Sequence, residues 1–194
     1  MEKIELDGEM YYFINNSFVD SSFCRVPDEI QKKLSQIHFK QFDYKSYKKE
    51  ELLSFLKGLK ESEQYSKAKE VGEYALNIYA DDQNFVKMVL PILTSTYRAL
   101  HQPSLAISVA QKHTDLQKCD SPALWTSVAS AYCDVGEFRE ALSFVKFAIR
   151  KQRGTRMPSF EQKEVLNRIA KNLNMTESEI TQFINIKDEE DSDF

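Results

Sequence analysis

Residues 122–152 read PALWTSVASAYCDVGEFREALSFVKFAIRKQ, in which two helical patterns are separated by one glycine, Gly136. Side chains on one face of a helix recur at spacings of three and four residues. The first half has such a face in Trp125, Val128, Ala129 and Tyr132. The second half has one in Phe138, Ala141, Val145 and Ala148. The segment therefore predicts two antiparallel helices joined by a turn at Gly136.

The order of large and small residues in this segment resembles the tetratricopeptide repeat (TPR). In that family a large residue, a leucine and a small residue precede a tyrosine, and an alanine, an aromatic residue and an alanine follow in the second helix. The matching positions are Trp125, Ala129, Tyr132, Gly136, Phe138, Ala141 and Ala148. Two positions depart from the family pattern: Val145 replaces an aromatic residue, and Arg153 stands near the place of the closing proline.

Two weaker copies of the pattern lie upstream. Their residues are Leu52, Phe55, Leu56, Leu59, Tyr65, Ala68 and Ala75 in the first copy, and Leu90, Leu93, Thr94, Tyr97, Ala106 and Ala110 in the second. The aligned alanines, Ala68, Ala106 and Ala141, are 38 and 35 residues apart, against about 34 in the family. Pro103 suits a helix start, whereas Pro91 predicts a kink or a late start in the helix before it.

The resemblance implies a mostly α fold, a TPR-like α-solenoid in which each helix pair leaves an apolar face that its neighbour covers. We expect three TPR-like repeats in residues 48–153, capping helices in 158–186 and an acidic, disordered tail in 187–194. A small N-terminal β-hairpin or meander with a helix is expected in residues 1–46. The chain has 194 residues with only 5 glycines and 5 prolines, which agrees with long helices.

Turn and strand signals alternate in the first 46 residues. Asp7-Gly8 and Asn15-Asn16 each separate short apolar runs, the third of which spans residues 17–24. A helix is expected from Asp28 to about Phe39. The aromatic residues of this ribbon are Tyr11, Tyr12, Phe13, Phe18 and Phe23. A sheet this small is marginal alone, so the rings either cover one end of the helical region or form a docking surface for another protein or subunit.

Two helix-capping signals mark the C-terminal part of the chain. Ser159 with Gln162, and Thr176 with Glu179, have the spacing of a capping box. The helix expected from Phe160 to about Leu173 carries one apolar stripe, as a capping helix of a repeat array should. The last residues, KDEEDSDF, include five acids. They either solubilise the chain or form a docking tail that contacts basic residues of the repeat groove.

The sequence offers no pattern typical of an enzyme or of a cofactor or metal site. No HExxH, GxSxG, GxGxxG or GKS/T string occurs, and the three cysteines form no CxxC pair. His38, His101 and His113 are far apart in the sequence. Neither a signal peptide nor an apolar run of about 18 residues is found, so we expect a cytoplasmic protein with no membrane contact.

In TPR-like arrays the first helix of each pair lines the concave groove where a peptide lies. The corresponding positions here are Leu53, Lys57 and Lys60, then Met88, Ser95 and Arg98, then Thr126, Ser130 and Asp134. Lys57, Lys60 and Arg98 form a modest basic strip suited to an acidic segment or a terminal carboxylate. Leu53 and Thr126 stand where some family members carry carboxylate-clamping residues, so a chaperone-tail ligand is disfavoured.

The resemblance implies a protein–protein interaction adaptor or scaffold that binds a peptide or protein segment in the concave groove of the repeats. The alternative is a nucleic-acid-associated regulator that uses a basic cluster in residues 146–156. That cluster comprises Lys146, Arg150, Lys151, Arg153 and Arg156. The net charge of −4 disfavours nucleic acid.

Overall fold

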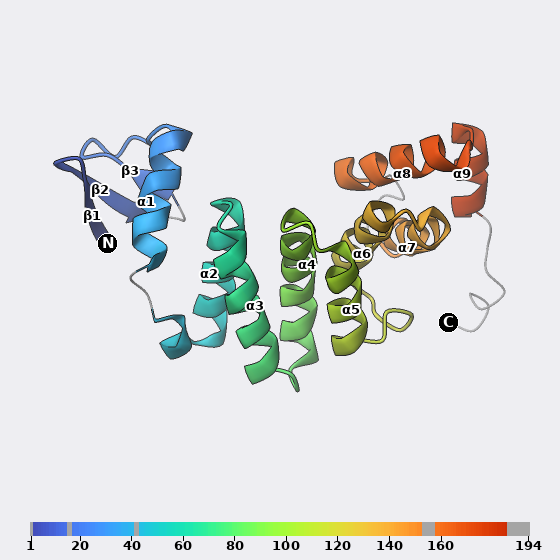
Figure 1. The fold of residues 1–194 in the computed structure, drawn as a ribbon, viewed down its shortest axis with the longest axis horizontal. Helices are drawn as coiled ribbons and strands as arrows, with labels where there is room; N and C mark the ends of the chain where they lie inside the picture. The colour runs from blue at the N-terminus through green and yellow to red at the C-terminus, as the bar shows by residue number, and fades with distance from the viewer. Residues whose placement is uncertain (1, 15–16, 41–42, 153–157, 186–194) are drawn as a thin grey trace. The chain divides into compact units, whose positions relative to one another are not determined.

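The computed structural model describes residues 2–14, 17–40, 43–152 and 158–185. The chain divides into two compact units, residues 1–79 and 80–194, and each is described by itself. The predicted turn at Asn15-Asn16, Arg153 and Arg156, and the acidic tail lie outside the described residues. The predicted mostly helical class is confirmed, with a small antiparallel sheet near the N-terminus (Figure 1).

The first unit opens with an antiparallel meander of β1 (Glu2–Leu6), β2 (Glu9–Ile14) and β3 (Ser17–Val19) in the order β1-β2-β3. Asp7 and Gly8 have φ of 55° and 84°, which is the geometry of the two-residue type I′ turn that favours a hairpin. The third strand is shorter than predicted because the chain folds back after Val19. The Asp20 carboxylate accepts hydrogen bonds from the backbone N–H groups of Ser22 and Cys24.

One face of this sheet is covered by α1 (Asp28–Lys40). Side chains alternate between the two faces of a strand, so every second residue points to the helix. The buried core of this part comprises Ile4, Tyr11, Phe18, Val26 and Leu34. The ribbon and α1 therefore enclose a small core together, most of it supplied by the strands. Tyr12 belongs to the other face, where Phe23 stacks on its ring.

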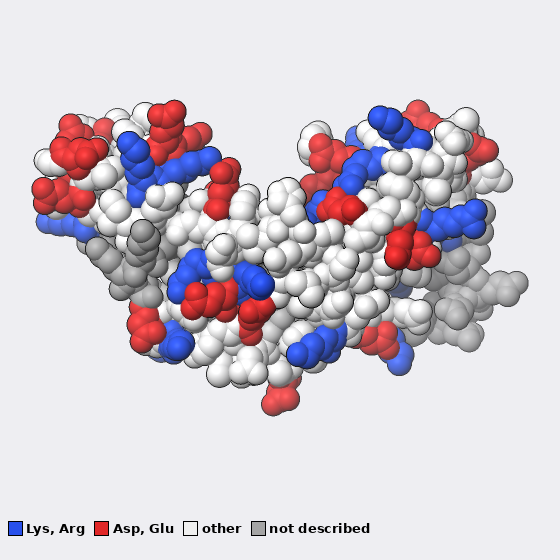
Figure 2. Space-filling view, in the orientation of Figure 1, with Lys and Arg blue, Asp and Glu red and all other residues white. Residues whose placement is uncertain are grey.

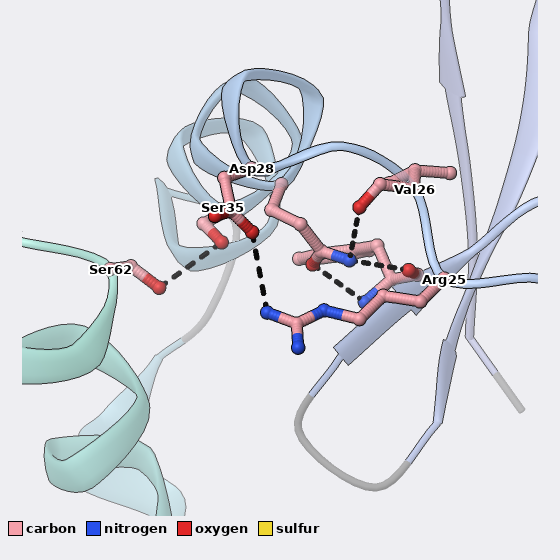
Figure 3. A network of polar contacts seen from close by, with 7 residues as sticks. Arg25, Val26, Asp28, Ser35 and Ser62 are labelled. Atoms are coloured by element: carbon pink, nitrogen blue, oxygen red, sulfur yellow. Dashed lines mark hydrogen bonds and ion pairs between the residues drawn. The ribbon is translucent and has the colours of Figure 1, made fainter.

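A helical hairpin completes the first unit, with α2 (Lys49–Glu61) and α3 (Tyr65–Ile78) packed together after a short helix, η1 (Tyr44–Ser46). The Tyr44 hydroxyl donates to Glu70 at 2.6 Å. Burial, then the bond to the Glu70 carboxylate, raises the pKa of Tyr44 to about 12, so this tyrosine stays neutral. Between α1 and the end of α2, the Ser62 hydroxyl donates to the Ser35 hydroxyl at 3.1 Å (Figure 3).

The second unit consists of helices. They are α4 (Gln83–Ala99), α5 (Pro103–His113), α6 (Pro122–Val135), α7 (Phe138–Arg150), α8 (Phe160–Leu173) and α9 (Glu177–Asn185). α4 packs against α5, and α6 against α7, as two hairpins; α6 also contacts α4 and α5. α8 lies against α6 and α7 (Figure 1). No helix of the described residues is long and apolar enough to cross a membrane.

The three hairpins share one turn geometry. The residues at the turn, Glu63, His101 and Gly136, have φ of 59°, 57° and 85°. In each turn the next backbone N–H donates to the carbonyl five residues earlier at 2.9 Å: Gln64 to Leu59, Gln102 to Tyr97 and Glu137 to Tyr132. Five residues after each turn residue lies a fully buried alanine, Ala68, Ala106 or Ala141. The predicted register of the three copies is thus repeated in the backbone.

Local signals elsewhere in the sequence have mixed outcomes. Ser159 and Gln162 form the predicted capping box, and Thr176 and Glu179 exchange the expected bonds. Pro103 is the first residue of α5, as predicted. The predicted late start at Pro91 is wrong, because α4 begins at Gln83 and continues through the proline. The buried residues of α4, which include Val86, Leu90 and Leu93, hold both halves of the helix in place.

The shared turn gives two substitutions with opposite expected effects. Gly136→Ala places a Cβ at φ +85° with no atom within 4 Å. Only backbone strain is added, so we expect the free energy of unfolding of the second unit to fall by about 1 kcal/mol. His101→Gly removes such strain at φ +57° and should raise that free energy by about 1 kcal/mol.

Urea titration followed by the fluorescence of Trp125 measures both changes, because this is the chain's one tryptophan and is buried in α6. Two changes of the same sign would contradict an equivalent role for the two turn residues.

Candidate functional site

Three helices of the second unit bring two arginines to one aspartate. Arg98 lies in the last turn of α4, Asp134 near the end of α6 and Arg168 in α8. Arg98 Nε donates to Asp134 Oδ2 at 2.6 Å, and Arg168 Nη2 donates to Asp134 Oδ1 at 2.6 Å. Arg98 lies three residues before the turn residue His101, and Asp134 two residues before Gly136. Both side chains therefore lie near the C-terminal ends of their helices, which are close together.

The charges of this site do not balance. The Asp134 side chain is 24% exposed. Burial alone would raise its pKa, but the hydrogen bonds from Arg98 and Arg168 outweigh that effect and lower the pKa below its usual value. One carboxylate therefore faces two guanidinium groups. Each guanidinium has five N–H donors, so Asp134 cannot satisfy them all and a net positive charge remains.

An open cavity of about 680 Å³ adjoins the three charged groups. Its lining consists of Ser95, Arg98, Ala99, His101, Pro103, Asp134 and Arg168. The small and apolar side chains of Ala99 and Pro103 leave room beside the arginines. The arrangement can bind an anionic group, with the carboxylate of Asp134 holding the two arginines in place before a ligand arrives.

The structure gathers three of the predicted groove residues at this cavity, Ser95, Arg98 and Asp134. Met88 lies on α4 and is 48% exposed. Leu53, Lys57 and Lys60 lie on α2 in the first unit, where both lysines are exposed. The predicted basic strip of Lys57, Lys60 and Arg98 thus takes its members from two different units.

Two predicted groove residues, Thr126 and Ser130, are only 5% and 7% exposed. Their hydroxyls donate to the carbonyls of Pro122 and Thr126, at 2.8 and 3.0 Å. Thr126 Oγ1 also accepts a hydrogen bond of 3.2 Å from the buried Gln162 of α8. The capping helix therefore covers this part of α6, and a partner does not reach these side chains in this structure.

Reasoning from the sequence did not place four residues at the cavity: Ala99, His101, Pro103 and Arg168. Arg168 has the pattern of a solvent-facing residue on the capping helix, and His101 that of an ordinary loop residue. Arg168 lies 34 residues beyond Asp134 in the chain, so helical periodicity carries no sign of the contact. The place of His101 at a turn could have been predicted, because it aligns with Gly136 in the third copy.

The basic cluster of residues 146–156 does not form an exposed patch in its described part. Lys146 is 5% exposed, and its Nζ lies 4.9 Å from the centre of the Phe183 ring. Arg150 is half-buried and Lys151 is exposed. On the face drawn in Figure 2, among the coloured residues, basic side chains are intermingled with acidic ones and form no continuous basic surface.

A second cavity, of about 540 Å³, lies within the first unit, between the ribbon, α1 and the end of α2. Its cations have partners close by: Arg25 with Asp28 at 3.3 Å (Figure 3), and Lys32 with Glu63 at 2.8 Å. Glu61 also lines it. Acids outnumber bases here, so this cavity has no surplus positive charge for an anionic ligand.

Side chains of other reactive types are scattered or buried. Among the described residues, no group of three or more His, Cys, Asp or Glu side chains could hold a metal ion. Burial raises the pKa of the Cys133 thiol to about 11, and burial lowers the pKa of His113. These groups therefore stay neutral at neutral pH and are packed into the helices that carry them.

No protein-family model, no curated protein and no solved structure matches the chain. The choice of a functional site thus depends on the geometry of the two cavities. Of these two cavities, the one beside Asp134 has arginine donors in excess of the acceptors that hold them.

Asp134→Asn tests the electrostatic account of the site. A carboxyl whose folded pKa is lowered contributes stability above its unfolded pKa of about 3.9, and that stability is lost as the pH falls through the folded pKa. We expect the variant to lower the free energy of unfolding of the second unit by about 1 kcal/mol at pH 7, since the pair is partly exposed. The difference should be smaller at about pH 3 than at pH 7, because the stability that the Asp134 carboxylate contributes is progressively lost as the pH falls below its unfolded pKa.

Urea titrations by Trp125 fluorescence at both pH values measure the effect. Glu164→Gln, which removes an exposed acid from α8, is the control and should change little. A loss of stability of equal size at both pH values would contradict the account.

Proposed function

We propose that the chain is a non-enzymatic interaction protein that binds an acidic segment of another protein at the cavity beside Arg98, Asp134 and Arg168. The observation that carries the proposal is the convergence of two guanidinium groups, from α4 and α8, on one carboxylate at the wall of an open cavity. The TPR-like order of residues supports the same class of function, an adaptor or scaffold whose helix pairs present a peptide-binding surface.

Recognition would begin with the N–H groups of the two arginines. A Glu or Asp side chain, or a terminal carboxylate, accepts hydrogen bonds from the donors that Asp134 leaves unsatisfied. Asp134 already fixes both arginines, so little side-chain entropy is lost when the ligand binds. The ligand carboxylate also lies near Asp134, and that repulsion limits the affinity and makes a single acidic group a better fit than a dense acidic run.

Apolar parts of the cavity indicate what should flank the acidic group. Ala99 and Pro103 line the space next to the arginines, and small apolar side chains of a peptide could pack on them. A segment with acidic and small apolar residues in alternation meets both requirements. A protein segment is favoured over nucleic acid because the face drawn in Figure 2 has no continuous basic surface, and Lys146 of the basic cluster is buried.

Fluorescence anisotropy with two labelled decapeptides tests the proposal. One alternates Glu and Ala, and the other has Gln in place of each Glu. We expect the Glu peptide to bind the full chain and the Gln peptide not to bind. Arg98→Gln or Arg168→Gln should each weaken binding about tenfold, the effect of losing one charge-assisted hydrogen bond.

Arg139→Gln is the matched control, because it removes the same charge from an exposed position on α7 outside the cavity. Trp125 fluorescence checks that each variant is folded. Equal losses in all three variants would show unspecific attraction to positive charge, and unchanged binding in Arg168→Gln would rule out the site.

A further inference from the structure

The two edges of the N-terminal sheet are treated differently. At the β3 edge, the backbone N–H of Phe18 donates to Gln31 Oε1 at 2.8 Å, and Gln31 Nε2 donates to the Phe18 carbonyl at 2.6 Å. The same amide reaches the Val26 carbonyl at 3.3 Å (Figure 3). The Val26 N–H also donates to the Phe18 carbonyl at 3.3 Å, and Arg25 forms a bridge with Val19. A side-chain amide of α1 and the backbone of residues 25–26 therefore satisfy the groups that a further strand would use, and together they block that edge.

The other edge belongs to β1, which has β2 as its one neighbour in the sheet (Figure 1). Because the Asp7-Gly8 turn has two residues, the flanking pair Leu6 and Glu9 is hydrogen-bonded. Hydrogen-bonded and non-hydrogen-bonded pairs alternate along an antiparallel ladder. Ile4 therefore also bonds to β2, whereas Lys3 and Glu5 direct their backbone N–H and C=O groups away from it.

Among the described elements, nothing takes the place of a neighbouring strand as a hydrogen-bond partner for these outward groups. No hydrogen bond from another described element reaches the backbone of Lys3 or Glu5. Both side chains are exposed on the sheet face opposite α1, and Ile4 between them is buried toward α1. The edge is short, open and charged, with one base and one acid two residues apart.

We propose that β1 pairs antiparallel with β1 of a second copy of this chain, around a two-fold axis at Ile4. Lys3 then lies opposite Glu5 of the other copy, and Glu5 opposite Lys3. These are the two residues whose backbone groups face outward, so each pair can exchange two N–H···O bonds. The two three-stranded sheets join into one, and both copies use the same surface, as a two-fold dimer requires.

The charges select this register over its neighbours. Only residues with outward backbone groups can form the hydrogen-bonded pairs between the two β1 strands. The nearest alternative registers therefore have the two-fold axis at Lys3 or at Glu5. An axis at Lys3 would place lysine opposite lysine, and an axis at Glu5 would place glutamate opposite glutamate. Like charges directly opposite each other are destabilising in a sheet, and opposite charges are favourable.

The pairing should be weak and concentration-dependent. The backbone bonds supply the attraction, while exposed Lys–Glu pairs contribute little energy and mainly set the register. Lys3 is also held near the sheet, since its Nζ lies 5.9 Å from the centre of the Tyr12 ring. This interface lies in the first unit and is independent of the acidic-segment site of the second.

Sedimentation velocity of the full chain over a concentration series tests the proposal. We expect a monomer–dimer equilibrium in the wild type. Lys3→Glu and Glu5→Lys should each be monomeric, because each places like charges opposite one another at both pairs. An equimolar mixture of the two variants should again dimerise, since every pair then joins a lysine to a glutamate.

Two further variants separate charge from backbone pairing. Glu5→Pro removes an outward N–H at an edge position that proline tolerates and should abolish the dimer, with the amide spectrum of α1 and β2 retained. Lys33→Glu changes the charge by the same amount as Lys3→Glu at an exposed position on α1 and should dimerise like the wild type. A wild type that is monomeric up to about 1 mM, the weakest affinity considered, overturns the proposal; so does a dimer that persists in both charge variants, or a mixture that stays monomeric.

Discussion

A single backbone constraint organises the helical part of this protein: one residue with positive φ at the turn of each helix pair. Glu63, His101 and Gly136 end a helix, and the chain reverses so that a buried alanine five residues later enters the packed interface. A small side chain at that point lets two helices approach closely. The left-handed position strains Glu63 and His101, which carry a Cβ, and leaves Gly136 unstrained. These helix pairs therefore tolerate local strain because helix packing over-determines the turn.

The Asp134 site is a consequence of that arrangement. Turns at His101 and Gly136 bring the ends of α4 and α6 together, and the capping helix then adds Arg168. The same ion pairs would serve stability and the proposed recognition, because Asp134 holds the arginines that a ligand carboxylate would use. A partner would use the donors that Asp134 leaves unsatisfied, and one of the two arginines belongs to α8, so the proposed binding depends on the packing of α8. Thr126 and Ser130 are buried under α8, so a partner can reach the predicted groove residues of the second unit only near the ends of α4 and α6.

In the first unit, the two edges of the sheet differ in whether their outward backbone N–H and C=O groups have hydrogen-bond partners. The Gln31 amide closes the β3 edge with two hydrogen bonds to Phe18, whereas the β1 edge is left with outward groups and alternating charges. One small sheet thus has one edge that is blocked and one that is complementary to itself. The aromatic residues of the ribbon are divided accordingly, with Tyr11 and Phe18 in the core against α1 and Tyr12 with Phe23 on the opposite face.

The sequence by itself determined the features that depend on neighbours within about five residues: the Asp7-Gly8 hairpin, the helix pairs, the capping pairs Ser159–Gln162 and Thr176–Glu179, and the register of the three alanines. Turn preference, capping and helical periodicity are local, and so can be read along the chain. Tertiary structure alone decided that Arg168 joins Asp134, that Gln162 covers Thr126 and that Lys146 is buried against Phe183. These partners are 34 to 37 residues apart. Their meeting depends on how whole helices stack, and an exposed charge has the same helical spacing whether or not another helix covers it.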